Sequence, residues 1–247
     1  MPTAHKIRQL LAFLMLQANQ AVPIHACIDE LWQSDPPKSA VSVTQTYVSE
    51  IRKMLRSASP EQGDGILVTR NRNYMLRVRS QDLDSEVFFE HVQRGHAAFG
   101  HGELQHAVAY FHRALSQWRG PALLDVPNGP AITMQRERLE ETRFGVEEQR
   151  VEAELRLGLH HEILAELQVQ AEAYPLRENV QAQYMVALYR CGRQVHAVNV
   201  YWRLRRTLSE QFGLDPSPRM QRLHQAILTS DPALDLPTLS PLRRVAG

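Results

Sequence analysis

Apolar residues in the first third of the chain recur with the spacing of three helices and then alternate as in a β-hairpin. Intervals of three and four residues place one apolar set on a single helical face: Ile7, Leu10, Leu11, Leu14 and Ala18. A shorter helix follows, with Ile24, Ile28, Leu31 and Trp32 at the same spacing. A third helix is expected from about Lys38 to Arg56, with Ser34 or Asp35 as its cap and the adjacent prolines in its first turn.

The hairpin is expected within "ILVTRNRNYMLRV", residues 66–78. Two short strands flank Asn71-Arg72-Asn73, and Asn tolerates the left-handed backbone of a tight turn. Tyr74, Leu76 and Val78 alternate toward the core. Three helices followed by such a hairpin predict a winged helix-turn-helix, whose wing can reach the DNA backbone or minor groove.

From Leu83 to Leu228 the pattern is helical almost throughout, and part of it repeats. One set of four residues recurs 34 positions later: Leu155, Gly158, Ile163 and Leu167 become Tyr189, Gly192, Ala197 and Tyr201. This period is typical of tetratricopeptide helix pairs, in which a small residue lets the two helices approach. Ala107, Phe111 and Ala114 have the spacing of Ala197, Tyr201 and Leu204. The chain is therefore predicted to be mainly α, with an N-terminal winged helix followed by a tetratricopeptide-like domain.

Composition and charge narrow the class of protein. Apolar residues make up 43% and charged residues 22% of the 247 residues, which is normal for a soluble globular protein. No apolar run reaches the ~18–20 residues that span a membrane, and the N-terminal apolar stretch lacks a signal-peptide cleavage pattern, so a cytoplasmic location is expected. Residues 1–80 carry 10 Lys and Arg against 6 Asp and Glu, whereas residues 81–247 carry 18 against 21. The basic first third favours an anionic partner.

Residues with reactive or metal-binding side chains do not form a catalytic or ligand pattern. The sequence contains no nucleophile elbow, phosphate-binding glycine loop or zinc motif. Cys27 and Cys191 stand far apart in apolar helical patterns and are expected to be buried thiols. The adjacent His160 and His161 are expected to diverge rather than converge on a metal. The sequence predicts no enzyme activity, no cofactor and no metal.

The third predicted helix separates into an apolar and a polar side. On a helical wheel, a narrow arc collects Lys38, Ser42, Gln45, Ser49, Arg52 and Arg56, with Thr46 and Lys53 beside it. The opposite side carries Val43, Tyr47, Val48, Ile51, Met54 and Leu55. A polar helix face usually just meets water. However, the two preceding helices and the basic hairpin favour a recognition helix, and a helix about 10–12 Å across fits the major groove of B-DNA.

Side-chain chemistry divides the predicted DNA-binding residues into two groups. Gln45, Ser49 and Arg52 are placed at the centre of the groove-facing surface, with Thr46 as a weaker candidate, because amides pair with adenine, guanidinium groups with guanine and hydroxyls with either bases or phosphates. The basic side chains around them are assigned to phosphates: Lys38, Lys53, Arg56, Arg70 and Arg72, with Lys6 and Arg8 as further candidates. Tyr47, Ile51 and Trp32 are expected in the core.

Seven ordered motifs carry a resemblance to a known family. They are "HKIRQLLAFLMLQANQAV" (5–22), "DELWQSDPPKSA" (29–40), "TQTYVSEIRKML" (44–55), "WRGPALLDV" (118–126), "YPLRENV" (174–180), "ALYRCGRQ" (187–194) and "FGLDPSP" (212–218). With these motifs the chain resembles the Streptomyces antibiotic regulatory protein family of transcriptional activators over roughly residues 5–234. The family pairs a winged helix of the response-regulator output type with a tetratricopeptide-like bacterial transcriptional activation domain.

The resemblance implies an organisation and a set of partners. It implies a winged-helix DNA-binding domain at residues 1–80 and an activation domain at 81–230, and the Pro-rich composition of residues 231–247 predicts a flexible tail. It also implies binding to direct repeats in promoters of secondary-metabolite gene clusters as a side-by-side homodimer, contact with RNA polymerase, no membrane association and a cytoplasmic, nucleoid-associated location. The family's larger members add an ATPase domain, whose phosphate-binding motif does not occur in this sequence.

Three features depart from the family pattern. Family members carry an antiparallel sheet before the first helix, whereas only Met1–His5 precede it here, so either the N-terminus is truncated or this member lacks the sheet. Glu50 stands where the family usually has Arg, which places a carboxylate near the DNA phosphates. Thr44 replaces an apolar residue, and Asn73 takes the place of a wing glycine. These departures leave open an alternative, a tetratricopeptide-type interaction module that modulates another regulator without binding DNA itself.

Overall fold

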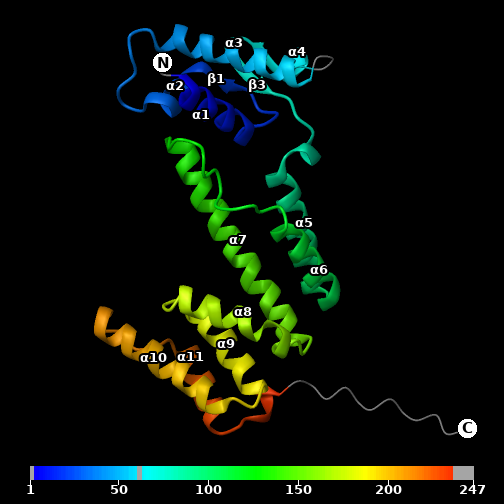
Figure 1. Cartoon of the computed structure of the whole chain (residues 1–247), viewed down its shortest axis with the longest axis vertical. Coiled ribbons are helices and arrows are strands. Elements are labelled where there is room, and N and C mark those ends of the chain that lie inside the picture. The colour runs from blue at the N-terminus through cyan, green and yellow to red at the C-terminus, as the bar shows by residue number, and fades with distance from the viewer. Residues whose placement is uncertain (1–2, 60–62, 236–247) are drawn as a thin grey trace, which may run out of the picture. The chain divides into compact units, whose positions relative to one another are not determined.

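The computed structural model describes residues 3–59 and 63–235, which form two compact units. One unit consists of residues 1–91 with 113–145, and the other consists of residues 92–112 with 146–247. Helices dominate both units, and the sheet in the first has three short strands (Figure 1). The prediction of a mainly α chain is confirmed. The domain boundary at residue 80 stays a prediction, and residues 113–145 pack with the N-terminal unit.

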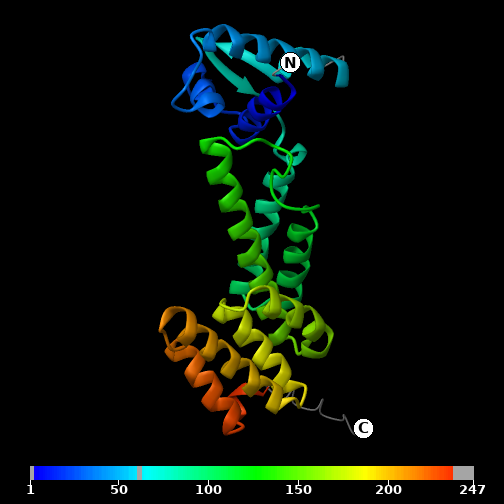
Figure 2. The same ribbon diagram turned by 60° about the vertical axis from the view of Figure 1, so that its left-hand side comes forward.

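The N-terminal unit contains the three predicted helices and the hairpin. Its first elements are α1 (Thr3–Leu16), β1 (Val22–Pro23), α2 (Ile24–Trp32), α3 (Ala40–Ala58), α4 (Gly63–Ile66), β2 (Leu67–Arg70) and β3 (Asn73–Leu76). The strands form an antiparallel sheet in the order β1-β3-β2, beside which α3 lies (Figure 2). β1 and α4 are absent from the sequence prediction because two- and four-residue elements are too short to show a period.

The helix predicted to read DNA begins later than expected. α3 starts at Ala40 with Ser39 as its N-cap, not at Lys38, and it ends at Ala58 rather than Arg56. Asp35 and Pro36 each precede a proline, which disfavours helical backbone at both positions, so the chain can enter the helix only after Pro37. Lys38 therefore lies in the approach to α3, where its side chain is exposed.

The core of the N-terminal unit combines the winged helix with a segment from much later in the chain. Leu10, Leu14, Tyr47 and Ile51 are at most 5% exposed, and Ile132 joins the same apolar cluster with no exposed surface. Tyr47 lies in the core as predicted and stacks on Trp32 with ring centroids 6.3 Å apart, whereas Trp32 is only partly buried and packs against the core. The exception on the predicted packing side is Met54, which is 47% exposed because α3 extends beyond the body that it covers.

Buried polar groups fix the join between α2 and α7 (Pro130–Arg156). The Glu30 carboxylate, 3% exposed as a residue, accepts from the amides of Ala131 at 2.8 Å and Ile132 at 3.3 Å. Helix N-termini favour such an anionic cap because their first amides lack partners within the helix. A Cβ atom at Gly129 would lie 2.0 Å from this carboxylate, so only glycine permits the approach.

The linking segment 113–145 is packed around aromatic and guanidinium groups. The segment contains the end of α6 (Leu104–Leu115) and the first part of α7, and the same unit contains η1 (Ser80–Asp82) and the start of α5 (Asp84–Gly100). Trp118 packs edge-to-face on Phe88 at 5.4 Å, and the Arg143 guanidinium lies 4.9 Å from its ring. Arg136 holds the loop before α7 by donating to the carbonyls of Ala122, Leu123 and Val126 at 2.9–3.1 Å.

The second unit contains helical hairpins with the predicted repeat. After the parts of α5, α6 and α7 that belong to it come α8 (His160–Ala173), α9 (Glu178–Arg190), α10 (Gln194–Phe212), α11 (Pro218–Leu228) and η2 (Pro232–Leu234). Gly158 and Gly192, 34 residues apart, both have positive φ, 84° and 73°, at equivalent turns. The echoed residues Ile163, Leu167, Ala197 and Tyr201 are buried. Of the predicted flexible tail, residues 236–247 lie outside the described residues, whereas Leu234 accepts a hydrogen bond from Arg190.

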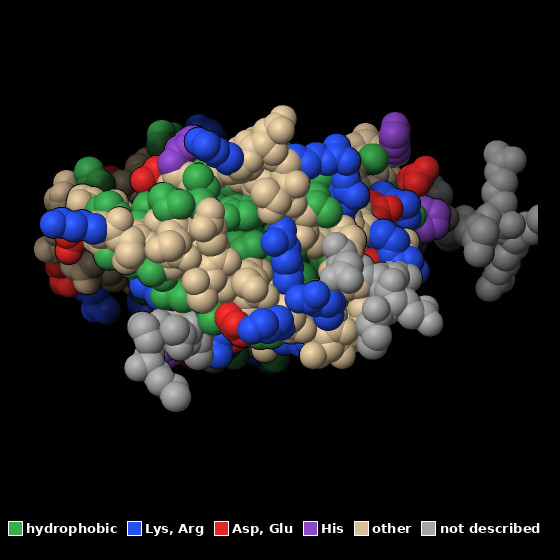
Figure 3. Space-filling model, turned by 90° about the horizontal axis from the view of Figure 1, so that it is seen from above, with side chains coloured by type: hydrophobic (Ala, Val, Ile, Leu, Met, Phe, Trp, Pro, Cys, Tyr) green, Lys and Arg blue, Asp and Glu red, His purple; other side chains and the backbone are tan. Residues whose placement is uncertain are grey.

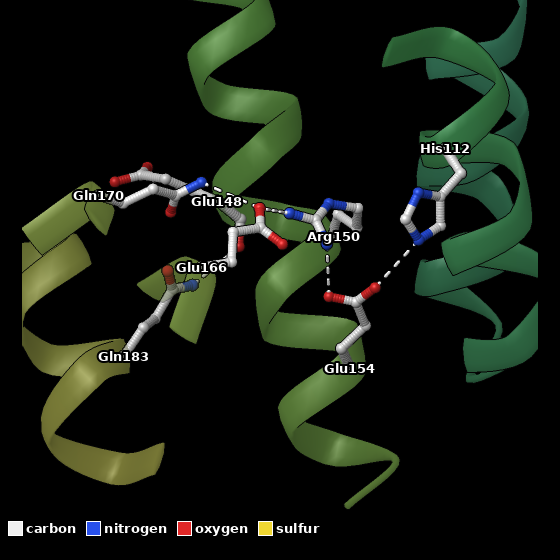
Figure 4. A network of polar contacts seen from close by, with 7 residues as sticks. All are labelled: His112, Glu148, Arg150, Glu154, Glu166, Gln170 and Gln183. Carbon is white, nitrogen blue, oxygen red and sulfur yellow. Dashed lines mark hydrogen bonds and ion pairs between the residues drawn. The ribbon is translucent and has the colours of Figure 1, made fainter. Parts of the chain in front are cut away.

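A polar network crosses this second unit (Figure 4). Arg150 of α7, with its side chain 5% exposed, donates to Glu154 at 2.7 Å and to Glu166 of α8. Glu154 also meets His112 of α6 at 3.1 Å, and Gln183 of α9 donates to the Glu148 carbonyl at 2.8 Å. Four helices are thus joined, three of them through Arg150 and Glu154, whose buried charges are paired, and α9 through a neutral amide hydrogen bond.

Two expectations about reactive side chains are wrong. Cys27 is fully buried as predicted, but Cys191 is only partly buried because it is the C-cap of α9, at a turn rather than within a packed helix face. His160 and His161 do not diverge, since their ring centroids lie only 4.6 Å apart. They are the first two residues of α8, where no preceding helical turn keeps the rings apart.

Candidate nucleic-acid interface

The outward side of α3 carries the side chains that the sequence assigned to DNA. Ser42, Gln45, Thr46, Ser49, Lys53 and Arg56 are all exposed, as is Lys38 before the helix. The opposite side is held by Tyr47, Val48 and Ile51, each at most 5% exposed. Figure 3 views the face that carries α3, and it shows Lys and Arg side chains distributed across that face with exposed hydrophobic side chains between them.

Arg52 differs from the other predicted groove residues. Its guanidinium donates to the Leu67 carbonyl at 3.0 Å and to the Thr69 hydroxyl at 2.6 Å, both in β2. These bonds draw the side chain away from the centre of the outward face and connect the recognition helix to the wing. Sequence spacing alone gave no signal of Thr69, since the wheel places α3 side chains but not their cross-element partners.

Glu50, the acidic residue that departs from the family pattern, forms an ion pair within α3. Glu50 accepts from Lys53 one turn later at 2.7 Å, with side chains 43% and 61% exposed. Lys53 is therefore partly neutralised in the absence of DNA. The net positive charge of the exposed face is lower than its count of basic residues suggests.

The wing tip is a tight turn with unusual backbone. Arg70 pairs with Asn73 at the end of the hairpin, and the two residues between them, Asn71 and Arg72, have φ of 49° and 63°. This is the left-handed geometry of a two-residue hairpin turn, which suits Asn but is strained for Arg. Both arginine side chains are exposed at the tip.

Two further basic candidates have partners within the unit. Lys6 donates to the Leu31 carbonyl and lies 5.9 Å from the Trp32 ring. Arg8 donates to the Asp125 carbonyl at 2.9 Å and faces its carboxylate at 3.6 Å. Lys6 and Arg8 thus already have partners within the unit, and their assignment to DNA phosphates stays a prediction.

One exposed apolar residue on α3 was missed by the sequence prediction. Val41 is 50% exposed and lies one helical turn before Gln45. An apolar side chain beside an amide can meet the methyl group of thymine in the major groove. Its only sequence signal was an apolar residue outside the packing arc.

Comparisons with known proteins match a DNA-binding regulatory domain followed by an activator domain. The family model "Transcriptional regulatory protein, C terminal" matches residues 2–76, and the "Bacterial transcriptional activator domain" matches residues 83–228. The chain is 42% identical over 238 residues to the regulatory protein DnrI of Streptomyces peucetius, covering 95% of this chain and 88% of that protein. The chain belongs to the Streptomyces antibiotic regulatory protein family of transcriptional activators.

Other members and a solved structure extend the likeness. The transcriptional regulator RedD of Streptomyces coelicolor is 34% identical over 95% of this chain and 67% of its own length. The structure of Mycobacterium tuberculosis EmbR in complex with a low affinity phosphopeptide superimposes with a TM-score of 0.86 at 30% identity, over 92% of this chain and 60% of that one. Members of this family are transcriptional regulators, not enzymes. Within the described residues, no helix combines the length and apolar character needed to cross a membrane.

Proposed function

We propose that this family member activates a secondary-metabolite gene cluster by binding direct repeats in its promoters through α3 and the wing. The single observation that carries the proposal is the two-sided burial of α3. Gln45, Ser49 and Lys53 are exposed on one side, while Tyr47 and Ile51 anchor the other. An amide, hydroxyls and basic groups on one helix face match the groups that read and clamp a major groove.

Roles follow from what each side chain contacts. Gln45 and Ser49 are base-reading candidates, with Val41 positioned for a thymine methyl group and Thr46 and Ser42 beside them. Lys38, Lys53, Arg56, Arg70 and Arg72 are phosphate contacts. Arg52 orients the wing through its bonds to β2. Contact with RNA polymerase and side-by-side dimerisation on the repeats complete the proposal, and they rest on family membership.

The test is a binding titration of the full chain against labelled promoter DNA from its own gene neighbourhood, at several salt concentrations. Gln45→Ala is expected to cost ~1–3 kcal/mol on the specific site and little on random DNA. Arg72→Ala is expected to weaken both equally and to reduce the salt slope by about 1. Arg222→Ala, an exposed arginine in α11, serves as the matched control.

Titrations against DNA probes that carry one or two repeats test whether the protein binds as a side-by-side dimer. Such a dimer should bind the probe with two repeats more tightly than the probe with one. In vitro transcription with purified RNA polymerase tests activation. Unchanged mobility of every promoter fragment at low salt would contradict the proposal and favour the interaction module that does not bind DNA.

A further inference from the structure

A cluster of metal-ligating side chains lies in the second unit, apart from α3 and the wing. His160 and His161 begin α8, and Cys191 caps the C-terminus of α9. One possible ligand atom from each residue lies within 4.8 Å of the other two. Cys191 lies 30 residues after His161 in the sequence, and the two consecutive helices α8 and α9 bring these residues together. The sequence spacing alone therefore does not show the cluster.

The geometry points to a zinc-binding site formed by His160, His161 and Cys191. Cys191 Sγ and His161 Nδ1 are 3.4 Å apart. Two ligands of one tetrahedral zinc ion, at about 2.3 Å for sulfur and 2.0–2.1 Å for nitrogen, are separated by roughly 3.5 Å. This pair is therefore already at ligand spacing. The third ligand closes by about 1 Å, which rotation of a histidine side chain at the start of a helix can supply.

His160 provides a second, independent indication. Among the described residues its Nδ1 atom is buried and has no hydrogen-bond partner. Buried polar atoms normally have one, and the exceptions in native proteins include atoms that meet an ion. Coordination of a cation through Nδ1 would satisfy this atom.

The donor set selects the class of cation. Two imidazoles and one thiolate are borderline-soft ligands, which suit Zn²⁺ and exclude the oxygen-preferring Mg²⁺ and Ca²⁺. Binding releases the thiol proton of Cys191 to solvent, because thiolate is the ligand form. Three protein ligands leave a fourth tetrahedral position for water.

Nearby charges act in both directions. Burial is the main cause that lowers the pKa of His160 and raises the pKa of Cys191. The Glu162 carboxylate raises both pKa values, whereas Arg190 lowers that of His160 and Arg193 lowers that of Cys191. Arg190 is bound to the carbonyls of Leu155 and Leu234 at 2.6 and 2.8 Å, so its guanidinium is held in place by other groups. The carbonyl end of α9 adds negative potential beside Cys191. A bound ion would connect the start of α8 to the end of α9 and stabilise this helix pair.

The experiment uses the full chain, stripped of metal and reduced, and titrated with Co²⁺ as a spectroscopic substitute for Zn²⁺. A thiolate-to-cobalt charge-transfer band with the visible bands of tetrahedral Co²⁺ is expected to saturate at one equivalent and to disappear when Zn²⁺ is added. The chain has two cysteines, and Cys27 is fully buried, so the band reports Cys191.

Variants separate the site from adventitious binding. Cys191→Ser removes the charge-transfer band, and His160→Gln or His161→Ala weakens Co²⁺ affinity at least about tenfold. His101→Ala, an exposed histidine outside the cluster, leaves affinity unchanged. Zn²⁺ raises the melting temperature of the native chain but not that of Cys191→Ser, and circular dichroism checks that each variant is folded.

Absence of the charge-transfer band in the native chain, or its persistence in Cys191→Ser, overturns the site. The site is also overturned if the His160→Gln and His161→Ala variants bind Co²⁺ as tightly as His101→Ala does. The outcome is independent of DNA binding, which is measured on the other unit.

Discussion

The Arg52 guanidinium on α3 donates to the Thr69 hydroxyl of β2 at 2.6 Å and to the Leu67 carbonyl at 3.0 Å. The recognition helix and the wing are thereby connected by one side chain in the part of the molecule proposed to meet DNA. A hydrogen bond from a charged donor is directional, so it fixes the angle between the helix and the hairpin.

We expect Arg52→Ala and Thr69→Val to weaken DNA binding in the same way, alike on specific and random sequences, because each frees the wing. Thr69→Ser keeps the hydroxyl and serves as the control. A double-mutant cycle on urea unfolding should give a coupling energy of about 0.5–1 kcal/mol between the two residues. Loss of sequence preference in Arg52→Ala, with Thr69→Val unaffected, would instead assign Arg52 to a base contact.

Substitutions of Glu50 are expected to increase the affinity for DNA rather than to reduce it. Its carboxylate pairs with Lys53 at 2.7 Å on the proposed DNA face. Replacing it with Gln should free Lys53 and remove repulsion from the phosphates. Glu50→Arg should add a contact and steepen the salt dependence by about 0.9 in the log–log slope. Binding titrations at several salt concentrations measure both effects, with Glu86→Gln, an exposed acid in α5, as the control. No gain from either substitution at low salt would place Glu50 away from the bound backbone.

Two substitutions of Arg72 distinguish the effect of wing stability on DNA binding from the effect of wing charge. Its φ of 63° is unfavourable for a side chain with a Cβ atom. Arg72→Gly should therefore raise the free energy of unfolding by about 1 kcal/mol, whereas Arg72→Ala keeps the strain and should not. Both variants should weaken DNA binding equally, because both remove the same cation. Urea unfolding and DNA titration of the two variants provide the comparison, and stronger binding by Arg72→Gly than by Arg72→Ala would show that turn strain, not charge, controls the wing.

Helices that are long enough to show a regular spacing of apolar residues were predictable from the sequence. The apolar arcs of α1, α2 and α3 and the repeat around Gly158 and Gly192 are dictated by burial of one helical face, which leaves a clear pattern. The wing was also predictable, because Asn71 supplies turn chemistry between alternating residues. Boundaries were less certain, as at Ala40, since the restriction imposed by two consecutive prolines acts beyond the periodic segment.

Contacts between distant segments were not predictable. Arg52 was placed correctly on its helix, yet its partner Thr69 lies on another element. Glu30 gave no sign that it would meet the amides of Ala131 and Ile132, about 100 residues away. Cys191 and His161 meet only because two helix ends come together. Periodicity encodes which side of an element is buried, but not which element covers it.

The capping of α7 by Glu30 makes stability depend on pH. Burial is the main cause that raises the pKa of the Glu30 carboxyl above its usual 4.5, although the amides of Ala131 and Ile132 and the side chain of Gln9 oppose it. The folded state therefore holds this proton more tightly than the unfolded state. The protonated side chain contributes its full stability below about pH 4.5, and that contribution is lost as pH rises from 4.5 through the raised pKa.

Glu30→Gln cannot ionise, so the free energy of unfolding of the native chain should fall relative to this variant across the same pH interval and then level off. Urea unfolding of both proteins at a series of pH values measures the difference, and subtraction cancels the other titrating groups. Glu86→Gln, which alters an exposed acid, should show no such trend. A difference that rises with pH would mean that the amide hydrogen bonds outweigh burial and that the pKa of Glu30 is lowered rather than raised in the folded state.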